Sequence, residues 1–474
     1  MSTRRRLAAV GAPVAAVAAA ALLPAGSLAP FRAHAAPERA AIPRVTFTDT
    51  RLGNGLRVLV SEDHRAPVVS IAVTYNVGSR DERPGRTGFA HLFEHMMFKG
   101  SANVGPGEHM WLIFSNGGTL NGTTNKDRTL YFETLPANQL DLALFLEADR
   151  MRSLEITKEN LDNQRHAVQE ERRLRVDNQP YGRTFEIVDE LAYDNFAYEH
   201  SVIGSMADLD AASVEDVAAF FTTYYAPNNA ALAIVGDVDT RACLEKVRRY
   251  FEAIPSQPPP PAVDLREPPQ REERRRTLDD RLARLARVDL AFKVPPSFTA
   301  DDDALQVLAD VLGSGRSSRL YEALVRQKQL AVSASAFRVE SRGPGLFRIV
   351  ATAAPGKRVE ELEESIHAEI EGLKVKGIAP WELEKARNAA RRALAAGLLS
   401  SLDRAVGLSE YAALYGDPNL INTRAERLAA VTAADVQRVA RTYLTPENRT
   451  VVITRPAQAP TAARSGAPVD RRAS

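Results

Sequence analysis

The spacing of apolar residues predicts both strands and helices. Residues 68–75 form a mostly apolar run typical of a buried strand, and residues 129–134 alternate as a strand does. Apolar positions in residues 138–153 and 158–175 have helical spacing. Asn54-Gly55 is a strong turn signal before the apolar segment that follows it. Strands joined through hairpins, with helices grouped between them, predict an α+β fold rather than a doubly wound parallel sheet.

The two halves of the sequence match each other at one fixed spacing. The motif Tyr-x-x-Pro-x-Asn at residues 224–229 returns at residues 443–448, an offset of 219 positions (443 minus 224). Two predicted strands keep this offset: 231–236 matches 450–455, and 70–73 matches 289–292. Because distant segments share one offset, we predict a tandem duplication of an α+β domain of about 200 residues.

Composition marks the borders of the two repeats. Residues 254–285 are rich first in proline and then in charged side chains, which predicts a linker. The linker separates a first domain, residues 45–253, from a homologous second domain, residues 286–455. Residues 456–474 are rich in alanine, proline, arginine and serine, and we expect a disordered tail there.

Residues 1–35 have the pattern of an export signal. Arg4, Arg5 and Arg6 precede a segment rich in alanine, valine and leucine, and residues 33–35 have the small-x-small pattern of a cleavage site. A transmembrane anchor is the alternative, but the prolines and glycines in this segment argue against it. The arginines are compatible with either general or twin-arginine export. No later stretch approaches the ~20 apolar residues of a membrane span, so we expect a periplasmic or secreted protein.

The overall composition excludes several kinds of partner and cofactor. The 61 Lys and Arg residues nearly balance the 60 Asp and Glu residues, giving a net charge of +1 and no electrostatic reason to expect nucleic acid. Hydrophobic residues make up 45% of the 474 positions, which is typical of a soluble globular protein. The single cysteine, Cys243, excludes an intramolecular disulfide and a cysteine-rich metal site.

Candidate chemistry is concentrated in residues 88–98. His91 and His95 are four positions apart in a predicted helix, so both imidazoles share one face and can reach one zinc ion. Glu94 lies three positions after His91, where it can accept a proton from a zinc-bound water as a general base. This is the inverted form, H-x-x-E-H, of the H-E-x-x-H motif. Three unpartnered polar residues on a buried helix are the alternative, but they would cost several kcal/mol, so we favour a metal site.

Two histidine ligands need a third ligand, usually a carboxylate, and the second long helix offers Glu170 and Glu171. Leu161 and Val168 are seven positions apart and mark the inward face of this helix. Glu171 follows Val168 by three positions and projects with it, whereas Glu170 projects to the opposite side. The pattern favours Glu171 as the ligand, with Glu170 as the alternative.

The second half lacks these residues. At the offset of 219 positions it has Asp310, Gly313 and Ser314 in place of the two histidines and the glutamate. Ala390 or Ala393 stands near the counterpart of the third ligand. We therefore expect the second half to close a chamber or hold substrate.

With these motifs the chain resembles the pitrilysin and insulysin family of zinc peptidases, especially the two-domain branch that includes mitochondrial processing peptidase. The resemblance extends from about residue 45 to 455 and includes His91-x-x-Glu94-His95, Val168-x-x-Glu171, the segment around Asn54-Gly55 and residues 313–321. It implies an α+β fold, one zinc ion per chain held by His91, His95 and Glu171, and Glu94 as the base. It also implies that residues 117–124 form an edge strand that holds a peptide substrate, with Asn121 as a polar substrate-binding residue.

Two positions depart from the family pattern. Catalytic subunits of the family often have a carboxylate seven positions before the ligand glutamate, where this chain has Gln164. Gln164 shares the inward face and can orient the site, but it cannot act as an acid or as a substitute ligand. Arg326 matches a substrate-binding arginine of the second domain, yet it lacks the tyrosine that follows seven residues later in the family.

The sequence therefore predicts a periplasmic or secreted zinc endopeptidase that hydrolyses peptides or unfolded segments. The family implies a chamber of four such domains, and hence a homodimer or a heterodimer with a paralogous subunit. Two alternatives remain open: a catalytic subunit that needs this partner for activity, and a noncatalytic scaffold subunit that binds peptides. The complete set of His91, Glu94, His95 and Glu171 argues against the scaffold, and the broken motif at Arg326 favours it.

Overall fold

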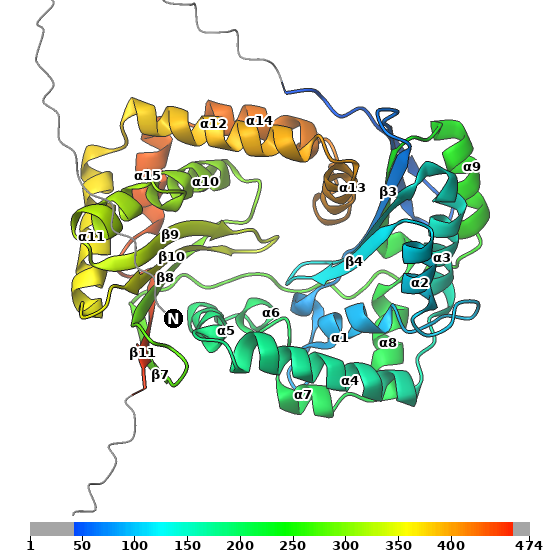
Figure 1. Ribbon diagram of the computed structural model, residues 1–474, viewed down its shortest axis with the longest axis horizontal. Coiled ribbons are helices and arrows are strands. Elements are labelled where there is room, and N and C mark those ends of the chain that lie inside the picture. Colours follow the sequence, from blue (N-terminus) through cyan, green and yellow to red (C-terminus); the bar gives the residue numbers. More distant parts are fainter. Residues whose placement is uncertain (1–41, 458–474) are drawn as a thin grey trace, which may run out of the picture. The chain divides into compact units, whose positions relative to one another are not determined.

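The computed structural model describes residues 42–457. The predicted export signal, residues 1–35, lies outside the described residues, and so does the predicted tail except for its first two positions. The described residues contain two β-sheets with helices packed on them (Figure 1). None of the described helices is both long enough and apolar enough to cross a membrane.

The first sheet has the strand order β1-β2-β6-β3-β5-β4. Strands β2 and β6 pair in parallel, and the remaining neighbours pair antiparallel. Strand β4 is at one edge, paired with β5 on one side. The bounds are β1 (Thr48–Arg51), β2 (Arg57–Glu62), β3 (Val68–Tyr75), β4 (Thr119–Thr124), β5 (Thr129–Pro136) and β6 (Ala230–Gly236).

The second sheet, in the order β7-β11-β8-β10-β9, repeats the first from β2 to β4. Its parallel pair, β7 with β11, takes the place of β2 with β6. Strand β8 begins 219 positions after β3 (287 minus 68), so the predicted duplication and the α+β fold are confirmed. The bounds are β7 (Arg274–Asp280), β8 (Arg287–Val294), β9 (Ala331–Val339), β10 (Gly345–Ala353) and β11 (Arg449–Pro456).

Strand β7 corrects the predicted linker, because it lies inside residues 254–285. Its sequence, Arg-Arg-Arg-Thr-Leu-Asp-Asp, has too little apolar surface to be recognised as a strand. It forms because its backbone pairs with β11, a strand whose own side chains are mostly buried. Its arginines also meet acids, as in the contact of 2.5 Å between Arg275 and Glu363. An edge strand needs only one paired side, so charged residues are tolerated in it.

One face of each sheet is covered by helices from the same half of the chain. Buried side chains of α1, α3, α4, α8 and α9 form one core with the first sheet, and those of α10, α11, α12 and α15 form a second core. The bounds are α1 (Phe89–Met96), α2 (Glu108–Ser115), α3 (Leu140–Ser153), α4 (Lys158–Arg172), α5 (Gly182–Ala192), α6 (Phe196–Glu199), α7 (Met206–Asp210), α8 (Val214–Tyr224), α9 (Thr240–Phe251), α10 (Ala300–Gly313), α11 (Val359–Lys376), α12 (Pro380–Gly397), α13 (Ser401–Glu410), α14 (Leu420–Ala430) and α15 (Ala433–Tyr443).

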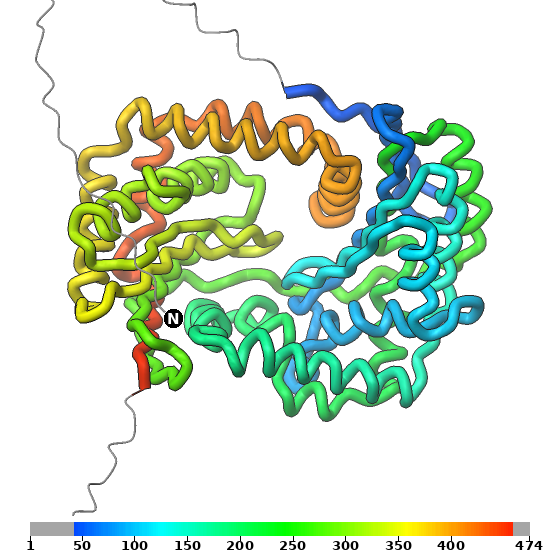
Figure 2. The backbone as a smooth tube through the Cα atoms, in the orientation of Figure 1, coloured from blue at the N-terminus to red at the C-terminus, as the bar shows by residue number. Residues whose placement is uncertain are grey.

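The opposite face of each sheet is covered by a helix from the other half. Helix α13 lies on β3 and β6, as the orange segment beside the blue and cyan strands in Figure 2. It buries Leu408 against the first sheet, and Ser409 bonds to Thr74 at 2.8 Å. Helix α5 lies on β8 and β11 in the same way, burying Val188. The two helices start 219 positions apart (401 minus 182), so the duplicated halves exchange equivalent helices.

Candidate metal centre

Helix α1 is held at its first turn by a buried carboxylate. Glu82 accepts hydrogen bonds from the backbone amides of Gly88, at 2.9 Å, and Ala90, at 2.8 Å. These amides have no partner within the helix, and a carboxylate beside them also interacts favourably with the helix dipole. Gly88 has a φ of +87°, and a Cβ there would lie 2.7 Å from the carbonyl oxygen of Ile203. Only glycine fits at this close approach.

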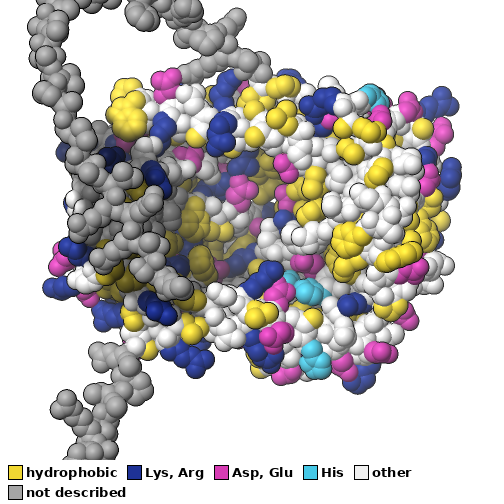
Figure 3. All heavy atoms as spheres, viewed as in Figure 1, with side chains coloured by type: hydrophobic (Ala, Val, Ile, Leu, Met, Phe, Trp, Pro, Cys, Tyr) yellow, Lys and Arg dark blue, Asp and Glu magenta, His cyan; other side chains and the backbone are white. Residues whose placement is uncertain are grey.

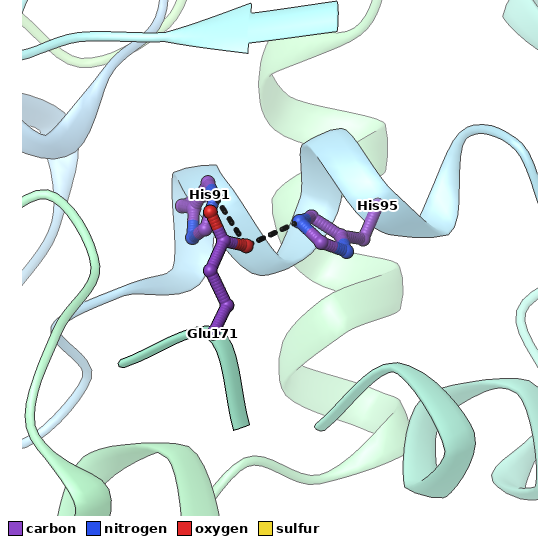
Figure 4. Close-up of side chains that lie close together, drawn as sticks. All are labelled: His91, His95 and Glu171. Carbon is purple, nitrogen blue, oxygen red and sulfur yellow. Dashed lines mark ion pairs between the residues drawn. The ribbon is translucent and has the colours of Figure 1, made fainter. Parts of the chain in front are cut away.

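His91 and His95 project from α1 towards Glu171 of α4 (Figure 4). Nε2 of His95 lies 3.2 Å from Oε2 of Glu171, and Nε2 of His91 lies 3.6 Å from the same oxygen. The two imidazole rings have centroids 4.9 Å apart. All three potential ligand atoms lie within 4.8 Å of one another. The structure therefore brings three of the predicted site residues to one point.

The direction of Glu171 follows from the packing of α4. Thr157 caps this helix by accepting a hydrogen bond from the amide of Asn160. Leu161, Gln164 and Val168 are buried on its inward face, and Glu171 lies one turn further along. Glu170 is exposed and bonds to Arg173 at 3.1 Å. The structure thus places Glu171, and not Glu170, beside the histidines. Gln164 lies inward, as the sequence pattern indicated.

The electrostatic surroundings of His91 and Glu171 favour the protonation states in which these residues can bind a metal ion. Burial lowers the pKa of His91, the nearby His95 acts in the same direction, and Glu171 opposes both. A hydrogen bond with His95 lowers the pKa of Glu171, against the opposite effect of burial. His91 is therefore neutral and Glu171 ionised near neutral pH, which are the forms that bind metals. Two imidazole nitrogens and one carboxylate oxygen also match the donor set of a catalytic zinc site.

Glu94 lies beside the same centre, under the edge strand β4. A Cβ on Gly122 of β4 would lie 3.0 Å from Cγ of Glu94 and 3.3 Å from the ring of Phe98. The strand can pass this close because it has no side chain there. Burial raises the pKa of Glu94, while the Thr124 hydroxyl and His95 act in the opposite direction. A carboxylate is thus held between the histidines and a free strand edge.

The two predicted substrate-binding residues have different surroundings. Asn121 is exposed on the edge strand β4, next to Gly122, whose amide donates to its side-chain oxygen at 2.9 Å. Arg326 is exposed on a helical turn of the second half and pairs with Glu322 at 3.1 Å. Asn121 thus lies on the strand that passes over Glu94, and the substrate-binding roles of both residues stay predictions.

In the second half, the position that corresponds to Glu94 has no space for a side chain. Gly313 of α10 stands at this position, and a Cβ on it would lie 1.7 Å from the backbone nitrogen of Ala336 in β9. Strand β9 therefore packs directly on the helix, where β4 leaves room for a glutamate side chain. This packing gives a physical reason for the absence of a metal-binding set in the second half.

Sequence reasoning missed a buried polar cluster beneath β5. Nε2 of His109 in α2 lies 3.4 Å from Glu133 of β5, and Glu147 pairs with Arg150 in α3. The Arg150 guanidinium lies 4.4 Å from the centre of the Tyr131 ring. These side chains come from three separate elements, and no local motif joins them. Arg150 bonds to Glu147, whereas one carboxylate oxygen of Glu133 is buried without a hydrogen-bond partner among the described residues.

An H-x-x-E-H helix beneath an open strand edge is typical of one class of zinc-dependent peptidases. Residues 57–205 match the family described as insulinase (peptidase family M16), and residues 211–390 match the peptidase M16 inactive domain. The zinc protease PqqE of Helicobacter pylori is 32% identical over 408 residues, which cover 85% of this chain and 92% of that protein.

Another relative and a solved structure agree with this assignment. The probable mitochondrial-processing peptidase subunit beta of Arabidopsis thaliana is 26% identical, with 83% of this chain and 76% of that protein covered. A solved structure of a protease from Helicobacter pylori has a TM-score of 0.83 and 31% identity, over 87% of this chain and 100% of that one. The chain belongs to peptidase family M16, and it is a metallopeptidase. The resemblance inferred from the motifs is confirmed.

Proposed function

We propose that this chain is a zinc-dependent endopeptidase that binds one zinc ion through His91, His95 and Glu171. The observation that supports it best is the convergence of these donor atoms beside Glu94 and under the free edge of β4. The relatives named as zinc proteases support the choice of metal. When bound, zinc polarises the peptide carbonyl and lowers the pKa of a water molecule.

Glu94 is the general base in this proposal. Its carboxylate accepts a proton from the attacking water and later returns the proton to the leaving amine. Strand β4 passes over Glu94 at Gly122, where a Cβ would lie only 3.0 Å from Cγ of Glu94, so the strand limits movement of this side chain. Restricted movement favours proton transfer because the donor and the acceptor must remain within hydrogen-bonding reach.

Strand β4 holds the substrate in an extended conformation. Its free edge offers backbone amides and carbonyls that a peptide can pair with as an additional strand. Asn121 lies on this edge and can bond to the peptide from the side. Because a folded domain cannot offer an isolated extended segment, the substrates are peptides or unfolded segments.

The proposed location is the periplasm or the exterior of the cell. The arginines, the apolar segment and the cleavage-site pattern within residues 1–35 support export. We further propose that two chains act together, as a homodimer or with a paralogous subunit. The second possibility, a catalytic subunit that needs its partner for activity, is supported by the missing tyrosine after Arg326.

Hydrolysis by the purified mature chain tests the proposal. We expect cleavage of short unstructured peptides, loss of cleavage with a chelator, and recovery on addition of zinc. Glu94→Gln is expected to keep bound zinc and lose at least 1,000-fold in kcat, because the base cannot be replaced by an amide. Substantial turnover by this variant would contradict the assignment of the base. No cleavage by a fully zinc-loaded chain would instead support the need for a partner.

Zinc affinity tests the third ligand separately. Glu171→Gln is expected to weaken zinc binding at least 100-fold in competition with a chromophoric chelator. Glu170→Gln is the matched control and is expected to stay within twofold of the native chain. The reverse order would show that the other carboxylate is the ligand.

A further inference from the structure

Helix α2 has an apolar face that nothing in the described structure covers. Met110, Trp111 and Phe114 are exposed by 37%, 64% and 57%, and they follow one another at the spacing of a single helix face. Among residues 42–457, α2 is the only element with more than one exposed large hydrophobic side chain. Its opposite face is buried through His109 and Ile113, so the orientation of the helix is fixed.

This face is continuous with the strand that borders the metal centre. The amides of Gly117 and Gly118 donate to the carbonyls of Phe114, at 3.1 Å, and Ile113, at 2.9 Å, so α2 turns directly into β4. A Cβ on Gly118 would lie 2.9 Å from the Ile113 side chain, which shows how closely helix and strand meet. Hydrophobic side chains gather over α2 on the face seen in Figure 3.

The length of β4 relates this face to the cleavage point. Glu94 meets β4 at Gly122, which marks where the scissile bond of a bound peptide would lie. The strand begins at Thr119, three residues before Gly122, a distance of about 10 Å in extended chain. A peptide paired with β4 therefore passes the end of α2 two to four residues from its scissile bond. Every second side chain of that peptide points to the same side.

We propose that Met110, Trp111 and Phe114 form a subsite for a bulky apolar side chain of the substrate, two to four residues from the scissile bond. The inference rests on the proposed function and names its substrate class as peptides with an apolar residue at this distance. Backbone pairing with β4 supplies affinity without selectivity, and side-chain subsites supply the selectivity. Met110, Trp111 and Phe114 carry no charge, and Glu108, at the first turn of α2, accepts a hydrogen bond from the amide of Gly105 at 2.8 Å.

Cleavage profiling of a peptide library tests this subsite. We expect the native enzyme to prefer an apolar residue at least tenfold in kcat/KM at one position within that distance. The double variant Trp111→Gln and Phe114→Gln is expected to reduce this preference below threefold, because kcat/KM falls more for apolar peptides than for polar ones. The matched control is Trp381→Gln with Val375→Gln, two side chains exposed by 58% and 73% on other helices. An unchanged preference, or an equal loss for all peptides, would overturn the proposal.

Fluorescence gives a readout that does not depend on hydrolysis. The chain has two tryptophans, so Trp381→Phe leaves Trp111 as the sole reporter. In a chain that also carries Glu94→Gln, apolar peptides are expected to shift Trp111 emission to shorter wavelength, and polar peptides are not. If the native chain alone fails to hydrolyse peptides but Trp111 responds, the subsite stands and a peptidase that is active without a partner is excluded. If the native chain hydrolyses peptides but Trp111 does not respond, the proposed function stands and the subsite is excluded.

The molecular mass in solution distinguishes substrate from a second copy of the chain. We expect the double variant to keep the mass of the native protein in light scattering. Dissociation of a native dimer by Trp111→Gln and Phe114→Gln would show that this face binds another chain, and would overturn the subsite.

Discussion

The side chain of Glu133, on β5, is buried inside the protein. His109, Glu147 and Arg150 surround it, and its side chain is about 1% exposed. Burial raises the pKa of Glu133 from 4.5 to about 7, and Arg150 partly opposes this rise. Since each pKa unit corresponds to about 1.4 kcal/mol, ionising Glu133 costs about 3 kcal/mol more in the folded protein than in the unfolded chain.

The pH dependence of stability follows from this difference. Below pH 4.5 the carboxyl is protonated in both states and contributes no such cost. Between pH 4.5 and pH 7 the unfolded chain ionises first, so the native protein loses stability as the pH rises. Glu133→Gln cannot ionise. Its free energy of unfolding relative to the native protein is therefore expected to rise by about 3 kcal/mol between pH 4.5 and pH 8.

Urea unfolding followed by circular dichroism at both pH values measures this change. Metal binding and other titrations occur in both proteins and cancel in the comparison. Glu245→Gln, on the exposed part of α9, is the control and is expected to stay within about 0.5 kcal/mol of native at each pH. A difference for Glu133→Gln that is constant with pH, or that becomes smaller at pH 8, would refute the reasoning. It would show that Arg150 keeps Glu133 ionised throughout.

Two further substitutions test the packing around the site and between the halves. Gly122→Val is expected to lower kcat/KM at least 100-fold with the fold retained, because its Cβ alone would lie 3.0 Å from Cγ of Glu94. A kcat/KM above a tenth of the native value would show that β4 moves freely. Leu408→Ala is expected to cost about 2–4 kcal/mol in urea unfolding, because this side chain is fully buried under the first sheet. Leu399→Ala, at a side chain exposed by 70%, is its control, and equal effects of the two would contradict the helix exchange.

The parts of the fold that depend on local periodicity could be predicted. Strand β3 covers the predicted residues 68–75, and helix α4 starts at the predicted Lys158. The prediction that Glu171 rather than Glu170 faces the histidines agrees with the structure, because burial of Leu161 and Val168 fixes the rotation of α4. Its role as a ligand stays a prediction. Helix α4 ends at Arg172, short of the predicted 175, where a π-helical turn begins.

The parts that depend on distant pairing could not be predicted. Strand β7 has no apolar pattern of its own, and its structure comes from pairing with β11, which begins 175 positions later (449 minus 274). The exchange of α5 and α13 left no sign in either helix, since an amphipathic helix does not specify which sheet it covers. The cluster of His109, Glu133 and Glu147 joins three elements, and single polar residues in each give no pattern.

The exchange of helices has a consequence for synthesis of the chain. The last strand of the first sheet, β6, ends at Gly236, whereas α13 begins at Ser401, about 165 residues later. At ordinary translation rates the ribosome needs roughly ten to thirty seconds to make this interval. Throughout it the apolar face that includes Leu59 and Val235 has no cover of its own. The nascent first half is therefore a natural client for chaperones, and the protein reaches its protected state only when nearly the whole chain has been made.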